Sequence, residues 1–241
     1  MEIRTETVTL SAPDGQMPAH LCRPASGGPY PGVIVIQEAF GLNGHIRDVT
    51  ERIAREGYVT AAPDLYYRFG SPVVPYEDLP KAIDYLQKLD DTKVMAEVGA
   101  VIAHLKTLRE VRGDRIGITG FCMGGRVTFL AACQHASEIK AAVSFYGGGI
   151  AAAVPNAPLN FADRIRSPIL CLFGEIDPLI PLDQTKKVDD TLKRLGKTYE
   201  VKVYNGAGHG FFCNERGSYH AESAKDAWER AKAWLAKHLK S

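Results

Sequence analysis

The feature that most constrains the fold is a short, unbroken run of apolar residues, Gly32-Val33-Ile34-Val35-Ile36. A strand with one face in solvent alternates apolar and polar side chains, so a β-branched run of this length predicts a central strand that is buried on both faces. Strands of this kind belong to parallel sheets that helices cover on both sides. Further short strands are predicted at 58–62, 115–119, 139–146, 169–173 and 199–204.

Helical patterns separate these strands, at residues 45–56, 80–89, 94–111, 124–135, 181–195 and 219–239. The chain begins differently, because residues 3–10 alternate apolar and polar side chains and residues 17–23 can return as a hairpin partner after a turn at Asp14-Gly15. The expected fold class is therefore α/β, with a mostly parallel central sheet of about eight strands, helices on both faces and an antiparallel N-terminal edge.

Length and composition are those of an ordinary globular protein. The chain has 241 residues, of which 45% are apolar and 24% are charged, so a sizeable core can form. We expect a single domain over 1–241, since no linker interrupts the pattern. Prolines punctuate residues 66–91, which we expect to form an excursion over the functional site. The formal net charge of +1 gives no reason to expect nucleic acid or an anionic membrane as partner.

The five cysteines are widely spaced and include no C-x-x-C pair. An odd, scattered set is typical of free thiols in a reducing compartment, which favours the cytoplasm. The first residues show no charged segment followed by an apolar one, and no apolar run reaches ~18 residues, so we expect neither a signal peptide nor a membrane span. We expect a monomer, rather than an obligate oligomer, that acts on a small molecule.

One pentapeptide carries a chemical signature: Gly120-Phe121-Cys122-Met123-Gly124 runs from the strand at 115–119 into the helix at 124–135. It matches the G-x-S-x-G nucleophile elbow, with cysteine in the serine position. Such a turn projects the central side chain at a helix N-terminus, whose positive end stabilises a thiolate, so we predict Cys122 as the nucleophile. The alternatives are a buried, inert cysteine and a dinucleotide-binding loop, although the G-x-G-x-x-G pattern is absent.

The expected partners of Cys122 follow it in the order that α/β-hydrolases use, which is nucleophile, acid and histidine. Asp177 follows the strand at 169–173, and His209 lies on a glycine-rich loop after the strand at 199–204. His209 is predicted to take the thiol proton and Asp177 to orient the imidazole ring. A turn aspartate and a solvated loop histidine are the alternatives for each residue alone. The arrival of all three in order, each after its own strand, favours a triad.

An oxyanion hole is predicted from two backbone N–H groups. One belongs to Met123, directly after the nucleophile, and the other to Ala39 in the loop Gln37–Leu42. The N–H of Phe40 in the same loop is the alternative second donor. Glu38 in the same loop could approach the nucleophile, where its negative charge would disfavour the thiolate and restrain the resting enzyme. A hydrogen-bonded structural glutamate is the alternative for Glu38.

These motifs resemble those of the dienelactone hydrolase (carboxymethylenebutenolidase) family, whose members are α/β-hydrolases. The resemblance covers nearly the whole chain and rests on Gln37–Leu42, Ala62–Tyr66, Gly120–Gly125, Gly174–Pro178 and Gly208–Phe211. It implies the α/β-hydrolase fold and a Cys-Asp-His triad, with Glu38 in contact with the thiol. It also implies hydrolysis of an enol-lactone without a metal or other cofactor.

The sequence departs from the family where the family holds the carboxylate of its substrate with two arginines. One arginine follows the catalytic histidine by four positions, where this chain has Cys213, and the other lies after Asp64-Leu65-Tyr66, where Arg68 is the candidate. A neutral Cys213 cannot form the fork that arginine makes with a carboxylate, and Phe211 and Phe212 indicate a more apolar pocket. The residues expected to contact the substrate are Phe40, Arg68, Tyr146 and Phe211.

The motifs together predict a hydrolase that opens small esters or lactones through an acyl-enzyme. A non-enzymatic thiol sensor or binding protein on the same fold is the alternative from another class. A metal site of Glu38, His45 and His209 is a further alternative, although no metal-ligand spacing supports it.

Overall fold

The computed structural model describes all residues, 1–241, and the chain separates into two compact units, Met1–Ile118 and Thr119–Ser241. The boundary lies inside strand β5, Val111–Phe121, so the chain passes from one unit to the other without a linker. That the two units form a single domain stays a prediction.

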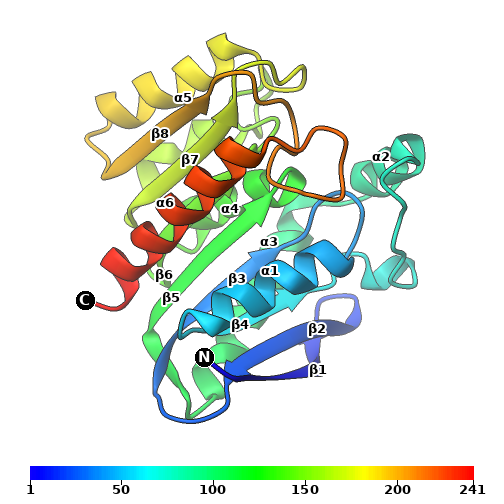
Figure 1. Ribbon diagram of the computed structural model, residues 1–241, viewed down its shortest axis with the longest axis vertical. Coiled ribbons are helices and arrows are strands. Elements are labelled where there is room, and N and C mark those ends of the chain that lie inside the picture. Colours follow the sequence, from blue (N-terminus) through cyan, green and yellow to red (C-terminus); the bar gives the residue numbers. More distant parts are fainter. The chain divides into compact units, whose positions relative to one another are not determined.

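Four strands of the first unit lie in the order β1-β2-β4-β3 (Figure 1). They are β1 (Ile3–Ala12), β2 (Gly15–Pro24), β4 (Val59–Pro63) and β3 (Tyr30–Ile36). β1 and β2 form an antiparallel hairpin, β2 is antiparallel to β4, and β3 is parallel to β4. The antiparallel N-terminal edge is confirmed, and β3 and β4 are almost completely buried, as expected of strands covered on both faces.

Two helices cover the strands of the first unit. α1 (Gly44–Arg55) contacts all four strands, and α3 (Asp91–Thr107) contacts β1, β3 and β4. Figure 1 shows α1 in front of these strands and α3 behind them. α1 begins after Asn43, whose side chain accepts a hydrogen bond from the N–H of Ile46, and the apolar face of the helix is buried.

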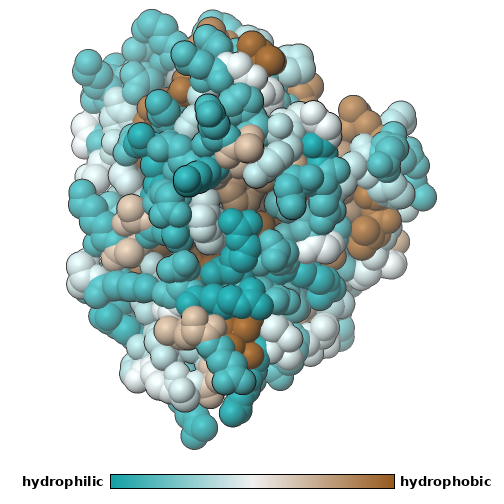
Figure 2. Space-filling model, viewed as in Figure 1, coloured by the Kyte–Doolittle hydropathy of each residue, from teal (hydrophilic) through white to brown (hydrophobic).

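The segment expected to form an excursion contains one 3-10 turn, η1 (Tyr67–Phe69), and one helix, α2 (Leu79–Gln87). The helix predicted at 80–89 is confirmed to within two residues. Ala82 is the one fully buried residue of α2, and hydrophobic surface gathers over this part of the molecule in Figure 2. The exposed apolar side chains of the segment are Val73, Leu79 and Ile83.

The strands of the second unit are parallel. They are β6 (Ile139–Phe145), β7 (Ile169–Gly174) and β8 (Tyr199–Tyr204), and β7 pairs with both of the others. The end of β5 lies beside β6, because Thr119 Oγ1 donates a hydrogen bond to the carbonyl of Val143 at 2.9 Å. The residues that follow β5, β7 and β8 therefore emerge at the same edge of the sheet.

Helices cover both faces of the second unit as well. α4 (Met123–Gln134) and α6 (Ala221–Leu239) both contact β6, and Figure 1 shows α6 in front of the strands and α4 behind them. α5 (Leu182–Arg194) contacts β8, and a 3-10 segment, η2 (Pro158–Arg164), contacts α4. The chain forms eight strands, and from β3 onward the strands alternate with helical segments, which confirms the predicted α/β fold class.

The helix predicted at 94–111 is wrong at its C-terminal end, because α3 stops at Thr107 and β5 already begins at Val111. The residues between them include no glycine or proline, so local propensity favours continued helix. The carbonyl of Glu110 instead accepts a hydrogen bond from the N–H of Tyr30 at 2.7 Å, a contact between distant parts of the chain. η2 was not predicted, since short 3-10 segments have no helical periodicity of their own.

None of the helices has both the length and the apolar content needed to cross a membrane. All five cysteines are free thiols, as predicted, and four of them are buried. The exception is the half-buried Cys122.

Candidate active site

Cys122 occupies a strained turn between β5 and α4. Its backbone angles are φ 56° and ψ −118°, a region that non-glycine residues rarely adopt and that commonly marks a functional position. The N–H of Cys122 donates to the carbonyl of Phe145 at 3.0 Å, and its own carbonyl accepts from the N–H of Gly125 at 2.9 Å. These bonds fix the turn at both ends and place the thiol directly before the first residue of α4, Met123.

Two glycines let this turn pack tightly. A Cβ atom on Gly120 would collide with the backbone of Gly124, and one on Gly125 would collide with the carbonyl of Phe145. The strand, the turn and the start of the helix are thus too close for any side chain at these two positions. Gly120 is one of the two small neighbours, two positions either side of the cysteine, that the nucleophile-elbow pattern requires. The role of Cys122 as nucleophile stays a prediction.

Asp177 and His209 form a buried pair in the second unit. Asp177 lies in the turn after β7 and His209 in the loop after β8, and Asp177 Oδ2 is 2.8 Å from Nδ1 of His209. The other carboxylate oxygen, Oδ1, accepts a hydrogen bond from the N–H of Leu179 at 2.8 Å, which fixes the orientation of Asp177. The two loops approach closely because Gly174 has no Cβ, which would collide with the carbonyl of Ala207.

The electrostatic surroundings of His209 favour its charged form. Burial opposes the charge and lowers the pKa of His209, but the nearby Cys122 sulfur and the hydrogen bond to Asp177 outweigh it and raise the pKa to about 10. Nε2 of His209 is buried and makes no hydrogen bond of normal geometry, although the sulfur is near enough to stabilise the imidazolium. Catalytic hydrogen bonds are often long before substrate binds.

Tyr146 and Phe211 form an aromatic wall beside the imidazole. The ring of Tyr146 lies edge-to-face against His209 and against Phe211, with a centroid separation of 5.3 Å in both cases. Tyr146 is fully buried and has φ 37°, so it is held in a strained conformation directly after β6. The rings of both residues are buried and contact each other, and the ring of Tyr146 also contacts the imidazole. That Tyr146 and Phe211 contact the substrate stays a prediction.

Glu38 is fully buried in the first unit and is held by a tyrosine that sequence reasoning missed. The hydroxyl of Tyr76 donates to Glu38 Oε2 at 3.1 Å and accepts from Nδ2 of Asn43 at 2.9 Å. Tyr76 comes from the irregular segment before α2, where no periodic pattern points to a role. The contact between Glu38 and the Cys122 thiol stays a prediction.

The loop that carries the second predicted oxyanion donor is also anchored within the first unit. The hydroxyl of Tyr66 donates to the carbonyl of Ala39 at 2.9 Å, and the ring of Phe40 lies 4.7 Å from that of Tyr76. Gly41 takes φ 86°, which lets the loop turn back on itself. The donation of the Ala39 and Met123 N–H groups to one oxyanion stays a prediction.

Arg68 is already committed to carboxylates of the first unit. Its Nε lies 2.9 Å from Asp14 Oδ2, and its Nη2 forms an ion pair with the buried Glu97. The structure therefore gives no support for Arg68 as the group that binds a substrate carboxylate. Cys213 is fully buried, and the guanidinium of Arg216, which sequence reasoning did not single out, covers Gly210 next to His209.

The fold and the elbow at Cys122 define the class of the protein as the α/β-hydrolases. Within that class, the model of the dienelactone hydrolase family matches residues 17–239. The chain belongs to the dienelactone hydrolase family, and it is a hydrolase of esters or lactones.

Individual relatives agree with this assignment. A Synechocystis sp. protein named "Putative carboxymethylenebutenolidase" is 38% identical over 247 residues, which cover 100% of this chain and 99% of the relative. An Escherichia coli O157:H7 protein of the same name is 40% identical over 92% of this chain and 83% of its own length. The crystal structure of a "Putative Dienelactone Hydrolase" from Klebsiella pneumoniae has a TM-score of 0.90 and 37% identity, with 99% of this chain and 100% of that chain covered.

Proposed function

We propose that the protein opens small esters or lactones through a covalent acyl-enzyme on Cys122, with His209 as the proton carrier and Asp177 as the residue that orients it. The observation that carries the proposal is the buried pair of Asp177 and His209, 2.8 Å apart, with the Cys122 sulfur near enough to raise the pKa of the imidazole. These surroundings support a positively charged His209 imidazole, which can stabilise negative charge that develops on the sulfur.

The proposed reaction has two halves. The Cys122 thiolate attacks the carbonyl carbon, and the N–H groups of Met123 and Ala39 stabilise the oxyanion. The C–O bond to the leaving group breaks, the alkoxide takes the proton of the His209 imidazolium, and a thioester remains. Neutral His209 then accepts a proton from water as the water attacks the thioester, and the collapse of that intermediate releases the acid and restores the thiolate.

The nucleophile limits the substrate class. A thiolate is itself a good leaving group, so a tetrahedral intermediate with a poorer one, such as an amide nitrogen, returns to the starting materials. Esters suit this nucleophile, and enol-lactones suit it best because their leaving group is a stabilised enolate. The buried aromatic residues Tyr146 and Phe211 support an apolar neighbourhood for the acyl group.

Rapid mixing with p-nitrophenyl acetate tests the nucleophile. We expect a burst of about one p-nitrophenol per active site, followed by slower turnover, and the mass of one acetyl group on a peptide that contains Cys122. Cys122→Ala should lose both the burst and the turnover. The matched control is Cys133→Ala on the same helix, since burial raises the pKa of the Cys133 thiol to about 12 and leaves it unreactive.

Two results would refute the proposal. One is normal turnover by Cys122→Ala. The other is oxidation of Cys122 by peroxide with no acyl-enzyme on any ester tested, which is the behaviour of a thiol sensor. We also propose a cytoplasmic location, which the five free cysteines support, and a small molecule as the substrate.

A further inference from the structure

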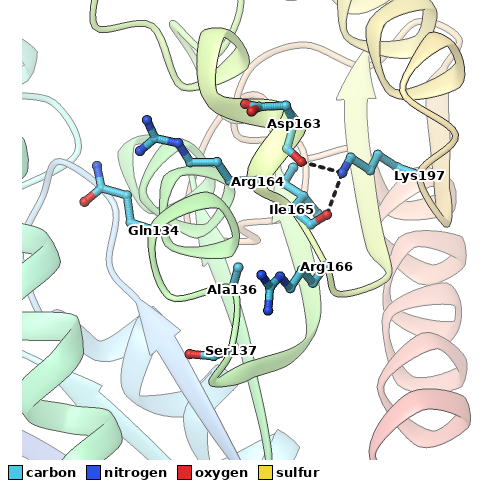
Figure 3. A pocket seen from close by; sticks show the side chains of 8 residues that line it. All are labelled: Gln134, Ala136, Ser137, Asp163, Arg164, Ile165, Arg166 and Lys197. Atoms are coloured by element: carbon cyan, nitrogen blue, oxygen red, sulfur yellow. Dashed lines mark hydrogen bonds between the residues drawn. The ribbon is translucent and has the colours of Figure 1, made fainter.

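One pocket of the second unit is lined by none of the residues of the proposed triad, and Figure 3 shows the side chains around it. It has a volume of about 410 Å³, within the usual range for small-molecule sites. It lies between the C-terminal end of α4, the end of η2 and the turn before β8. The residues that line it are Gln134, Ala136, Ser137, Asp163, Arg164, Ile165, Arg166 and Lys197.

The pocket is at the opposite end of the sheet from the triad. Arg166 comes shortly before the first residue of β7, whereas Asp177 comes shortly after its last residue. β7 has six residues, which at ~3.3 Å per residue separate the two ends by roughly 20 Å. A molecule in this pocket is thus not a substrate in contact with Cys122.

The local chain geometry directs two arginines to the same side. Ile165 is 2% exposed and points into the core, so its neighbours Arg164 and Arg166 both point outward, and Figure 3 shows their side chains along the pocket wall. Neither guanidinium forms an ion pair or a protein hydrogen bond, and Arg164 is steadied by the Phe161 ring at 5.0 Å. Two forked donor groups are therefore available to a ligand.

Lys197 fixes the backbone that carries these arginines. Its ammonium donates to the carbonyls of Asp163 and Ile165, at 2.7 Å each, so it ties down the chain on both sides of Arg164 (Figure 3). A loop held in this way loses little conformational entropy when a ligand binds.

An adjoining pocket of about 390 Å³ extends the positive surface. The two pockets share Asp163, and the second is also lined by Lys187, Thr191 and Arg194, which recur on one face of α5. The acidic Asp190 of the same helix pairs instead with Lys186 at 2.5 Å. The two pockets together are lined by one carboxylate, that of Asp163, and by five cationic side chains: Arg164, Arg166, Lys187, Arg194 and Lys197. This local excess of positive charge contrasts with the formal net charge of +1 for the whole chain.

We propose that these adjoining pockets bind a small molecule with at least two anionic groups of the phosphate or carboxylate type, with Arg164 and Arg166 as its principal ligands. Arginine forks match the paired oxygens of both groups, and the single positive surface suits a dianion. The Asp163 carboxylate lies on the wall and opposes an anion, so it weakens the binding.

Isothermal titration at fixed ionic strength, with inorganic pyrophosphate and succinate as separate probes, tests this site on the full-length protein. Saturable binding of pyrophosphate alone identifies a phosphate-type ligand, and binding of succinate alone identifies a carboxylate-type ligand. Arg164→Gln/Arg166→Gln should weaken the binding at least tenfold, since each charge-assisted bond contributes about 1.5–3 kcal/mol, or about tenfold or more in affinity. Asp163→Asn should strengthen the binding, because it removes the carboxylate charge that opposes an anion. The backbone carbonyl of residue 163 that accepts from Lys197 is kept in this variant.

Arg109→Gln is the charge-matched control, because Arg109 is 93% exposed and lies in the first unit. It should leave the affinity within about twofold of wild type. The proposal is overturned if neither probe binds saturably, if the double variant binds like wild type, or if Arg109→Gln weakens binding equally. Hydrolysis of p-nitrophenyl acetate should be unchanged in every variant, so failure here is distinguishable from failure of the proposed function.

Discussion

Single residues at the proposed triad combine strain with burial. Cys122 holds φ 56° and Tyr146 holds φ 37°, and both lie directly after strands whose carboxyl ends meet at one edge of the sheet. Such conformations persist only where the surrounding contacts fix them, as the hydrogen bonds of Cys122 and the aromatic packing of Tyr146 do. The carboxylate of Asp177 is fixed in the same way by the N–H of Leu179.

Asp177→Asn should lower kcat/KM for p-nitrophenyl acetate by about 10³ to 10⁴-fold. The amide keeps the size of the side chain but removes the charge that stabilises the imidazolium and selects its tautomer. Steady-state kinetics measure the loss, with the exposed Asp183→Asn on α5 as the control. An Asp177→Asn enzyme within tenfold of wild type would remove Asp177 from the mechanism.

The titration of His209 gives a prediction about stability. Its pKa in the folded protein is about 10, above the ordinary 6.5, so folded protein binds this proton more tightly than the unfolded chain does. The stabilisation is complete below about pH 6.5 and is lost as the pH rises through about 10. Urea unfolding across this window should show a falling free energy of unfolding. The fall should be smaller in Cys122→Ala, which lacks the sulfur that favours the charge, and an identical fall in both proteins would contradict this assignment.

Among the elements, the turn from β5 into α4 leaves the least room for change. Gly125 lies against the carbonyl of Phe145 and against Gly147, so β6 and the start of α4 meet without any side chain between them. The connection between β3 and α1 is held differently, by hydrogen bonds from Tyr76 to Glu38 and from Asn43 to Tyr76. The turn from β5 into α4 therefore depends on close packing, whereas the connection between β3 and α1 depends on a buried network of hydrogen bonds.

Gly125→Ala should destabilise the protein by about 1–3 kcal/mol or more, because the added methyl group has no space. Gly148→Ala is the matched control, since a Cβ there meets nothing within 4 Å. Thermal unfolding of both variants measures the difference. Equal melting temperatures for the two variants would show that the turn is looser than the structure indicates.

Tyr76→Phe should lower the free energy of unfolding by about 1–3 kcal/mol, because it leaves the buried Glu38 with one donor fewer. Tyr85→Phe, in α2, is the control. The ring of Tyr85 packs on Tyr66 and Phe69, and phenylalanine keeps that ring packing, so little stability should be lost. Urea titration compares the two. A neutral Tyr76→Phe would mean that water or another group replaces the lost hydroxyl.

At the scale of the whole molecule, the division into two compact units bears on how the chain unfolds. Their boundary falls within one continuous strand, β5, and the family model spans both of them. Both tryptophans, Trp228 and Trp234, lie in α6, so tryptophan fluorescence reports on the second unit alone, whereas far-ultraviolet circular dichroism reports on both units.

We expect the fluorescence and circular dichroism transitions in urea to coincide, as they do when a chain unfolds as a single cooperative domain. Sedimentation of the folded protein without urea should give one species near the chain mass of 26.3 kDa, in line with the expected monomer. Two separated transitions would divide the chain into independent domains at residue 118, and a heavier species would contradict the monomer.

The sequence by itself determined the eight strands, the six α-helices apart from the end of α3, and the order of the proposed catalytic residues. Short apolar runs, helical periodicity and the Gly120–Gly124 pattern are local properties, and backbone sterics and side-chain burial give them the same meaning in any chain. The strand ends that carry Asp177 and His209 could be predicted for this reason, and so could the hairpin of β1 and β2.

Only the tertiary structure decided which groups meet. α3 ends earlier than its helical sequence pattern predicts, and Glu110 instead accepts a hydrogen bond from the N–H of Tyr30. Arg68, which the sequence suggested as a substrate ligand, forms ion pairs with Asp14 and Glu97. The tie between Tyr76 and Glu38 joins residues 38 positions apart. Contacts of this kind depend on distances in space between groups far apart in the chain, and no local pattern of residues encodes such distances.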